Sequence, residues 1–463
     1  MNDTIIDKQL EYIKKINEIN KNKNKKYFIF TMGCSLNEND SEKISGMLTQ
    51  MGYSETFAME DADFILFNTC CVRENAEDRL FGKVGEAKKI KEKKNAIIAI
   101  GGCMMQENTM VEKINKSYPF VDILFGTHTL YKLPEDVYNL LITNNSVEDI
   151  VTIDGELYEG IPIKRSSNSK ALVTIMYGCN NFCTYCIVPY VRGRERSRLP
   201  EEILKEINEL AKDGYKEITL LGQNVNSYKG NGYKNINNFA DLLREIDKIN
   251  GIEKVSFVSP HPKDFTDDVI SAIRDSKKVS RVLHLPLQSG SSKVLKRMNR
   301  NYTKESYLNL ANKIKQEIPE IVFSTDIIVG FPGETEEDFE DTLDVVRQVN
   351  FEQVYMFIYS KRHGTPAETM EEQIPEDIKH KRFSRLQKLV EEQISINNKK
   401  YINTEHKILI EGTSKNNNDM LSGRTSTNKV VVINGPKDLI GKIVRVKIIS
   451  EHKWYLEGEI IDN

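Results

Sequence analysis

The chain of 463 residues contains no apolar run long enough to cross a bilayer, and its Asn-, Lys- and Ile-rich beginning lacks the apolar core and cleavage site of a signal peptide. A strong charge of one sign is also absent, because 65 Lys and Arg residues nearly balance 68 Asp and Glu residues. The formal net charge is −3, so nucleic-acid binding would have to come from a local basic surface. We therefore expect a cytoplasmic protein with no membrane partner.

Cysteine is scarce, and the odd total of seven argues against a complete set of disulfides. Three of the seven, Cys179, Cys183 and Cys186, stand within eight residues, and we call them the loop triad. Their Cys-x3-Cys-x2-Cys spacing allows one loop to hold an iron–sulfur cubane, which usually takes four thiolates, so that one iron is left open. A zinc site is the competing interpretation, but zinc normally needs four ligands and no second Cys or His pair lies nearby.

Three further cysteines each follow an apolar run of the first hundred or so residues. The runs at 27–31, 64–67 and 96–100 alternate with amphipathic segments, which predicts a parallel sheet. Because the carboxyl ends of parallel strands share one edge, where ligands bind in open α/β sheets, these cysteines are expected to converge on a second cluster. The alternative is three buried cysteines that pack as small apolar groups. The three cysteines, which we call the sheet triad, are Cys34, Cys70 and Cys103.

Changes in periodicity divide the chain into five predicted segments. The first is a polar lead-in, expected to be partly helical and solvated, and the second is the α/β domain, with a fourth strand at 123–127. A linker rich in turn residues follows. The fourth segment alternates strand and helix, and the fifth alternates apolar and polar residues as strands do. The boundaries are 1–26, 27–145, 146–168, 169–395 and 396–463.

The fourth segment contains six strand–helix repeats, which predict an open (βα)6 partial barrel whose open side suits a macromolecular substrate. A charged helix at 376–400 follows, and four short runs then predict a small all-β barrel. The expected fold class is therefore α/β, with an N-terminal open parallel sheet, a central partial barrel and a C-terminal β-barrel. The predicted strands are 171–176, 217–221, 255–258, 282–286, 322–329 and 353–359, and then 407–411, 429–433, 443–449 and 454–460.

The loop triad resembles the cluster loop of the radical S-adenosylmethionine (SAM) superfamily, in which the open iron holds the amino and carboxylate groups of SAM. From about Tyr27 to its end, the chain is similar to the methylthiotransferase family, and its last segment resembles the RNA-binding TRAM domain. The motifs that carry the family resemblance are Thr31-Met-Gly-Cys34, Asn68-Thr-Cys-Cys-Val-Arg-Glu-Asn-Ala76, Gly102-Cys103, the run 179–198 and Tyr359-Ser-Lys-Arg-His-Gly-Thr-Pro-Ala367.

Two stretches, 75–82 and 180–186, resemble the branch that acts on N6-dimethylallyladenosine next to the anticodon of tRNA. The sequence departs from the family pattern at Ser35-Leu36, at His363 and at Cys71. Cys71 is an extra thiol beside a predicted ligand, and we do not count it as a ligand.

The resemblance implies two [4Fe-4S] clusters, one on each triad, and two SAM molecules per turnover. One SAM methylates a sulfur carried on the cluster of the sheet triad. The other SAM is cleaved at the cluster of the loop triad to a deoxyadenosyl radical, which removes hydrogen from carbon 2 of the adenine before the methylthio group is transferred. An electron donor such as flavodoxin or ferredoxin is then required, and the protein is expected to be a monomer.

Polar turns at the ends of predicted barrel strands are candidates for contact with SAM or the substrate, although each alone is an ordinary strand–helix turn. The segment from Asp326 to Glu334 resembles the superfamily's adenine-contacting turn. His261 and His284, also near strand ends, are assigned no catalytic role. The candidate residues are Gly222, Gln223, Asn224, Ser259, Gln288 and Asp326.

Four arginines alternate directly after the loop triad, and an extended chain would place their guanidinium groups on one side, toward a phosphate backbone. Contact with RNA or with the SAM carboxylate competes with pairing to local carboxylates such as Glu195, Glu201 and Glu202. Two basic residues of the last segment are also candidates for RNA contact, against the alternative of a plain β-barrel cap. The six residues are Arg192, Arg194, Arg196, Arg198, Arg424 and Lys429.

Two rival functions remain at this stage. One is the same chemistry on another substrate, either threonylcarbamoyl-adenosine in tRNA or an aspartate of a ribosomal protein. The other is a non-catalytic iron–sulfur electron-transfer protein with an RNA-binding tail.

Overall fold

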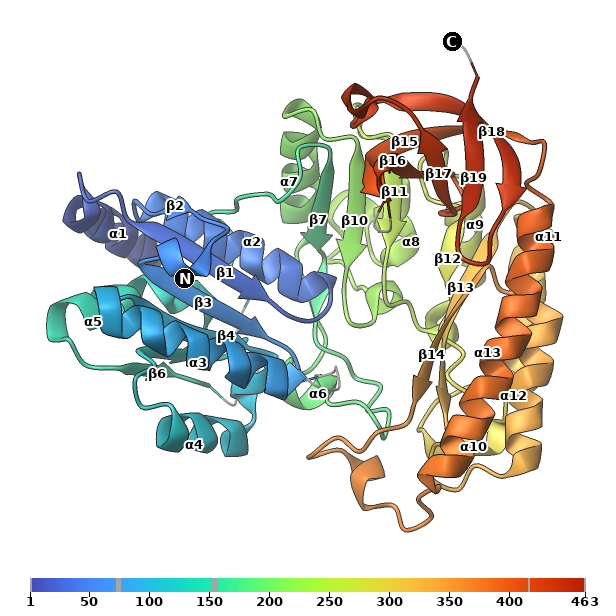
Figure 1. Cartoon of the computed structure of the whole chain (residues 1–463), viewed down its shortest axis with the longest axis horizontal. Helices are drawn as coiled ribbons and strands as arrows, with labels where there is room; N and C mark the ends of the chain where they lie inside the picture. The colour runs from blue at the N-terminus through green and yellow to red at the C-terminus, as the bar shows by residue number, and fades with distance from the viewer. Residues whose placement is uncertain (1, 72–75, 152–156, 415–416, 462–463) are drawn as a thin grey trace. The chain divides into compact units, whose positions relative to one another are not determined.

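The computed structural model describes residues 2–71, 76–151, 157–414 and 417–461. The chain forms two compact units (Figure 1), one of Met1–Phe182 with Cys186–Val258 and one of Cys183–Tyr185 with Ser259–Asn463. Residues 72–75 of the family motif and residues 152–156 of the predicted linker lie outside the described residues. None of the described helices has both the length and the apolar character needed to cross a membrane.

The first unit begins with a parallel six-stranded sheet in the order β2-β1-β3-β4-β5-β6. The four predicted strands are confirmed as β1, β3, β4 and β5, and β3 is buried along its whole length, as expected for a sheet covered on both faces. β6 lies in the predicted linker, where its Val-Glu-Asp sequence carries little strand signal. The strands are β1 Lys26–Thr31, β2 Ser54–Glu55, β3 Phe64–Thr69, β4 Ile97–Gly102, β5 Ile123–Phe125 and β6 Val147–Asp149.

Helices cover both faces of this sheet. Helices α1, α2 and α5 bury their apolar residues against one face, and α3 and α4 against the other. They are α1 Asn2–Asn20, α2 Ser35–Gln50, α3 Ala76–Lys94, α4 Asn108–Ser117 and α5 Leu133–Thr143.

Two predictions for these helices are wrong. The lead-in is not a solvated tail, because α1 buries Ile13 and Ile16 in the core and its Gln9 side chain donates to Glu135 of α5. Helix α2 begins directly after Cys34, whereas the sequence pattern predicts a helix only from about Asp40 to Gly52. The sequence does not show this start because polar residues of its first two turns, Asn37, Asn39 and Asp40, are buried rather than exposed.

The six predicted barrel strands are confirmed, but they form two separate parallel sheets of three, in the orders β11-β10-β7 and β12-β13-β14. The first sheet belongs to the first unit and the second to the second unit. Pro200 stands at the first position of α7, as expected from its fixed φ. The strands are β7 Lys170–Thr174, β10 Glu217–Leu221, β11 Lys254–Phe257, β12 Val282–His284, β13 Val322–Val329 and β14 Gln353–Ile358, and the helices are α7 Pro200–Lys212, α8 Phe239–Asp247, α9 Asp267–Asp275, α10 Ser292–Arg297, α11 Lys304–Glu317 and α12 Glu336–Val349.

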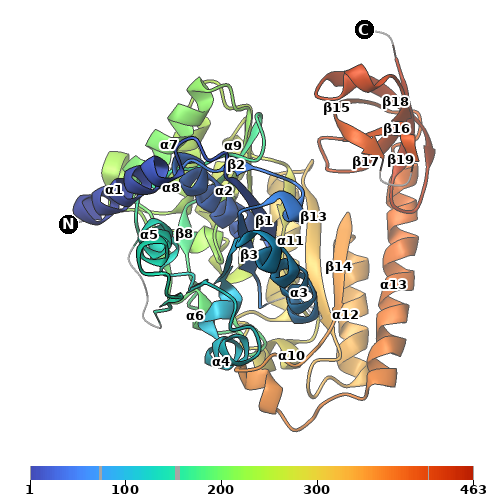
Figure 2. The same cartoon turned by 60° about the vertical axis from the view of Figure 1, so that its left-hand side comes forward.

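In the second unit, the long helix α13 (Glu376–Lys399) runs beside β14 and α12 and leads into a small β-barrel (Figure 2). The barrel closes in the order β15-β16-β17-β19-β18 around a core of Ile, Val and Leu side chains. β16 is an addition to the four predicted strands, since its polar sequence shows little alternation. The strands are β15 Glu405–Ser414, β16 Asn417–Arg424, β17 Val430–Asn434, β18 Ile443–Glu451 and β19 Leu456–Ile460.

Candidate active site

The sheet triad follows three neighbouring strands of the first sheet. β1 pairs with β3 up to Thr31–Asn68, and β3 pairs with β4 up to Thr69–Gly102. Cys34, Cys70 and Cys103 therefore leave the sheet at one edge, as the sequence predicts.

The backbone between these strand ends is closely packed. Gly33 has φ +118°, and a Cβ atom added there would lie 2.8 Å from the Cβ of Cys70, so the position requires glycine. The Asn37 amide donates to the carbonyl oxygen of Thr69 at 2.9 Å, and its own Oδ1 lies 3.4 Å from the Sγ of Cys34. The start of α2 thus ties the first cysteine to the end of β3.

Arg192, which follows the loop triad in sequence, is buried beside the sheet triad. Its Nε donates to the Sγ of Cys103 at 3.2 Å, and its Nη1 lies 2.7 Å from Asp40 Oδ2. Burial raises the pKa of Cys103 to about 11, while the guanidinium acts in the opposite direction. A buried cation at a cysteine sulfur fits a thiolate that ligates a negatively charged cluster.

The surroundings of Cys71 indicate a different role from that of its neighbour Cys70. It is packed in the apolar core with Ile65 and Phe67 of β3, and burial raises the pKa of its thiol well above the usual value. A buried cysteine among apolar residues can pack as a small apolar side chain. Among the described residues, no three His, Cys, Asp or Glu side chains surround one point as ligands of a single metal ion do.

The loop triad lies between the short strand β8 (Met176–Tyr177) and the helical turn α6 (Val188–Val191). Gly178 has φ +77°, and a Cβ there would lie 2.0 Å from the carbonyl oxygen of Arg194. The amide of Cys179 donates to the carbonyl oxygen of Gly193 at 3.1 Å. The chain that leaves the loop is thus folded back against the residues that enter it.

Arg300 was not predicted, yet it is the buried cation nearest to a loop-triad sulfur within the second unit's described residues. Its Nη1 lies 3.7 Å from the Sγ of Cys183, and its other nitrogens donate to Tyr302 Oη at 2.8 Å and to the Pro286 carbonyl oxygen at 3.1 Å. Burial lowers the pKa of Arg300, but Tyr302, Tyr185 and Cys183 raise it well above its ordinary value. The residue is therefore a fixed cation beside a predicted cluster ligand.

The first three candidate SAM residues support the cluster loop. Gln223 Oε1 accepts from the amide of Gly178 at 2.5 Å, and a Cβ at Gly222 would lie 2.6 Å from Met176 Cγ. Asn224 donates to Glu195 Oε1 at 3.1 Å, and Glu195, which sequence reasoning missed as a loop-supporting residue, also accepts from the amide of Asn180 at 3.2 Å.

The other three candidates belong to the second unit. Ser259 and Gln288 have φ angles of +57° and +68°, which are uncommon for residues other than glycine. The amide of Gln288 donates to the carbonyl oxygen of Asp326 at 2.8 Å. The carboxylate of Asp326 lies 3.2 Å from His284 Nε2.

The two histidines have identifiable structural contacts. His261 Nδ1 accepts from the amide of Lys263 at 3.2 Å, and burial, assisted by Arg300 and Lys263, lowers its pKa to about 2. His284 contacts Ser324 and Asp326 through its two ring nitrogens.

The candidate RNA-binding residues divide into two groups. Arg192 is buried and Arg198 half-buried, and both form ion pairs, which favours the local-pair alternative for them, although Arg198 pairs with Glu159 and Glu206 rather than with the carboxylates predicted. Lys429 is also half-buried, 2.9 Å from Glu352. The more exposed group consists of Arg194, whose guanidinium lies 4.2 Å from the Phe182 ring centroid, half-buried Arg196, and Arg424.

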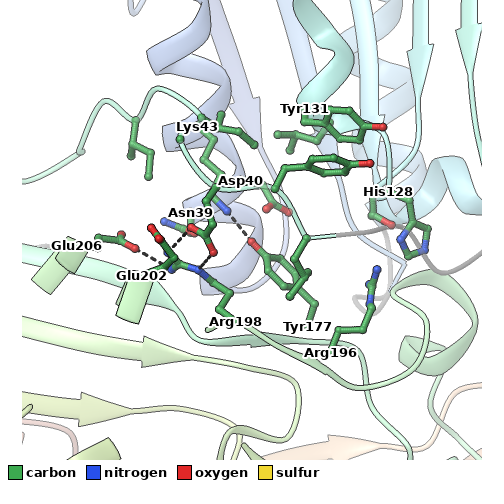
Figure 3. Close-up of a pocket in the computed structure, with 18 of the residues that line it drawn as sticks. Asn39, Asp40, Lys43, His128, Tyr131, Tyr177, Arg196, Arg198, Glu202 and Glu206 are labelled. Carbon is green, nitrogen blue, oxygen red and sulfur yellow. Dashed lines mark hydrogen bonds and ion pairs between the residues drawn. The ribbon is translucent and has the colours of Figure 1, made fainter. Parts of the chain in front are cut away.

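A cavity of about 230 Å³ lies within the first unit (Figure 3). Lys43 enters it from α2 and donates to the hydroxyl of Tyr177 at 2.6 Å. Burial lowers the pKa of Lys43, but Tyr177 and Asp40 raise it above its ordinary value. Arg196 and Arg198 line the same cavity, which therefore mixes charges of both signs with aromatic rings.

Three family profiles match successive parts of the chain. They are the Uncharacterized protein family UPF0004 at residues 26–126, the Radical SAM superfamily at 173–346 and the TRAM domain at 399–461. The fold is similar to that of the radical S-adenosylmethionine methyltransferase TsrM from Kitasatospora setae, with a TM-score of 0.52 and 13% identity over 71% of each chain. Fold and profiles together define a radical SAM enzyme with a TRAM domain.

Curated relatives narrow this class. The chain is 54% identical to a protein of Clostridium botulinum (strain Eklund 17B / Type B), and the alignment covers 98% of the chain and 99% of that relative. It is 56% identical to a protein of Clostridium tetani (strain Massachusetts / E88), and this alignment covers 96% of the chain and 98% of the relative. Both relatives are named tRNA-2-methylthio-N(6)-dimethylallyladenosine synthase. The chain belongs to this family. The family resemblance drawn from the cysteine motifs is thereby confirmed, and radical SAM membership implies SAM and a [4Fe-4S] cluster.

Proposed function

We propose that the protein is a radical SAM methylthiotransferase that adds a methylthio group to carbon 2 of N6-dimethylallyladenosine next to the anticodon of tRNA. The observation that carries this proposal is identity of about 54% to synthases of that name over nearly their whole length. The TRAM profile at residues 399–461 supports an RNA substrate.

In this proposal each triad holds one [4Fe-4S] cluster through its three thiolates. When bound, SAM and the two clusters supply the radical that removes hydrogen from carbon 2 and the methylated sulfur that replaces it. The protein would hold these groups in place and balance the negative charge of the cysteine thiolates. Arg192 donates to a sheet-triad sulfur, Arg300 faces a loop-triad sulfur, and Gln223 fixes the backbone at the start of the cluster loop.

The finer contacts are part of the same proposal. SAM or the substrate would contact turns at the ends of barrel strands, and Asp326 is a suitable acceptor because its carboxylate is partly exposed. We assign RNA contact to Arg194 and Arg424, which are exposed, and to Arg196, which is half-buried. The candidate SAM or substrate residues are Gly222, Gln223, Asn224, Ser259, Gln288 and Asp326.

The remaining predictions concern the setting of the reaction. Reductive cleavage of SAM needs an electron donor, for which flavodoxin or ferredoxin is suitable. We further expect a monomer that acts in the cytoplasm, where its tRNA substrate with a prenylated adenosine occurs.

The decisive experiment is nucleoside mass spectrometry of tRNA from a strain that lacks the protein. Loss of the methylthio form of N6-dimethylallyladenosine, restored by the wild-type gene but not by a Cys183→Ala variant, is the expected result. Unchanged content of this nucleoside would contradict the proposal, and loss of methylthio-threonylcarbamoyl-adenosine or of a modified ribosomal aspartate would assign one of the rival substrates.

A second measurement addresses the electron-carrier alternative. Reconstituted protein incubated anaerobically with SAM and dithionite should form 5′-deoxyadenosine. Its complete absence, with the cluster spectroscopically intact, would favour a carrier without catalytic activity.

A further inference from the structure

The edge strand β14 of the second unit presents one exposed aromatic face. Val354 is buried on the side that packs against α13, whereas Tyr355 and Phe357 remain 43% and 51% exposed on the opposite side. Two large aromatic rings left open at alternate positions of one strand form a contiguous surface rather than a scattered exception.

Polar groups share this face with the aromatic rings. Tyr355 is paired with Asp326 and Phe357 with Ile328 in the register of β13 and β14, so these side chains stand in rows on one side of the sheet. The His284 ring lies 6.0 Å from the Tyr355 ring, measured between centroids, and 3.2 Å from Asp326 Oδ2. The face therefore offers both stacking surfaces and hydrogen-bonding groups.

The TRAM barrel is attached at the beginning of the same strand. Lys429 lies 2.9 Å from the carboxylate of Glu352, the residue before β14, and Tyr401 donates to that carboxylate at 3.3 Å. Arg424 is the last residue of β16, before the turn that precedes Lys429; its Nη1 donates to the carbonyl oxygen of Asn428 at 3.1 Å, and its Nε lies 3.4 Å from Glu411 Oε2. These contacts fix a partly exposed guanidinium on the part of the TRAM barrel that is attached at Glu352.

The electrostatic effect on Tyr355 agrees with this arrangement. Burial and the Asp326 carboxylate raise the pKa of Tyr355, and Arg424 acts in the opposite direction. This effect of Arg424 on the pKa of Tyr355 agrees with the attachment of the TRAM barrel at Glu352, three residues before Tyr355.

We infer that Tyr355 and Phe357 form a stacking platform for unpaired bases of the tRNA anticodon loop, and that Arg424 holds the adjoining phosphate. A cation beside open aromatic rings is a combination that binds single-stranded RNA, and the TRAM profile of the same unit favours RNA as the occupant. This inference rests on the proposed function for the identity of the RNA, but it concerns binding and not the transfer step.

Binding of a fluorescent anticodon stem-loop to the cluster-loaded full-length protein tests the platform. Stacking contributes about 1–3 kcal/mol per base, which corresponds to roughly 5- to 150-fold in Kd. We expect Tyr355→Ala and Phe357→Ala each to weaken binding about tenfold, and Tyr355→Phe to bind like the wild type. Phe57→Ala removes a 91% exposed aromatic residue of the first unit and should leave Kd unchanged.

Leucine variants separate stacking from apolar burial. Tyr355→Leu and Phe357→Leu keep apolar volume but lose the π face, so they should bind nearly as weakly as the alanine variants. Arg424→Gln should weaken binding and reduce the slope of log Kd against log salt concentration by about one. Thermal unfolding of each variant checks that the second unit remains folded.

The outcomes distinguish this inference from the proposed function. Wild-type affinity in both alanine variants, or full affinity in the leucine variants, would overturn the platform even if methylthio-adenosine is still produced. Conversely, weakened RNA binding in these variants would support the platform even if the wild-type protein formed no methylthio product, a result that would overturn only the proposed function.

Discussion

The two cysteine triads each have a buried arginine beside one sulfur, but the charges around the two arginines differ. Arg192 contacts Cys103 and is paired with the carboxylate of Asp40 at 2.7 Å. Arg300 contacts Cys183, and its other partners in the described part of the second unit are neutral oxygens of Tyr302 and Pro286.

This difference determines how strongly each site depends on its bound group. A buried ion pair already balances the charge of Arg192, so the sheet triad can keep its structure when its thiols are protonated. The neutral partners of Arg300 do not balance its charge, and burying a single charge is costly. Its charge is balanced when the Cys183 sulfur beside it is a thiolate that binds a cluster. We therefore expect the loop site to be the more sensitive to removal of iron.

The largest expected effect comes from deleting one triad at a time. Replacing all three cysteines of either triad by alanine should lower the iron content from about eight to about four per chain, because each triad would hold one four-iron cluster. Formation of 5′-deoxyadenosine from SAM should fall to background only in the loop-triad variant. Equal loss of SAM cleavage in both variants would contradict the division of roles, and loss of all iron in either would contradict two independent clusters.

The Asp40–Arg192 pair should show the next largest effect. Asp40→Asn leaves a buried guanidinium without its counter-charge, which costs about 3–5 kcal/mol of unfolding free energy. The double variant Asp40→Leu with Arg192→Met replaces the pair by apolar groups and should be clearly more stable than Asp40→Asn. Scanning calorimetry measures the stability of the two variants. A double variant less stable than Asp40→Asn would refute the charge argument.

A smaller effect is expected at Arg300. Arg300→Gln loses the cation near Cys183 and leaves acceptors at Tyr302 and Pro286 unfilled, at a cost of about 1–3 kcal/mol. The rate of 5′-deoxyadenosine formation should fall about tenfold in Arg300→Gln. Arg300→Lys keeps the charge but not the planar set of guanidinium donors, so its rate should lie between those of the wild type and Arg300→Gln. An unchanged rate in Arg300→Gln, with iron content at the wild-type level, would show that the cation has no function at the cluster.

The strands predicted from the sequence for the first sheet are confirmed, and with them the common edge at which Cys34, Cys70 and Cys103 follow the strands. The loop triad needs only eight consecutive residues and the sheet triad only the rule that parallel strands end at one edge, so both can be proposed from the sequence, while cluster binding stays a prediction. The partners of these cysteines could not be found in this way, because Arg300 lies 117 positions from Cys183 and no periodicity links the two.

The wrong predictions have a related cause. The sequence of helix α1 predicts a polar tail because its apolar stripe, including Ile13 and Ile16, is narrow and some of its buried residues, such as Gln9, are polar. For Arg198 the sequence left both RNA contact and an ion pair open, and it did not indicate the partner, because Glu159 comes from the segment before the barrel. Both depend on tertiary contacts that outweigh local composition.

Cys70 and Cys71 provide the finest test of the comparison, since adjacent thiols are assigned opposite roles. Cys71→Ala should leave the iron content unchanged and lower the free energy of unfolding by only about 1 kcal/mol, because it removes one buried sulfur from the core. Cys70→Ala should release the iron of the sheet triad. In the iron-free protein at pH 8, iodoacetamide should modify exposed Cys34 much faster than Cys71, whose pKa is raised by burial. Loss of iron in Cys71→Ala would instead make Cys71 a ligand and would require a new account of the sheet triad.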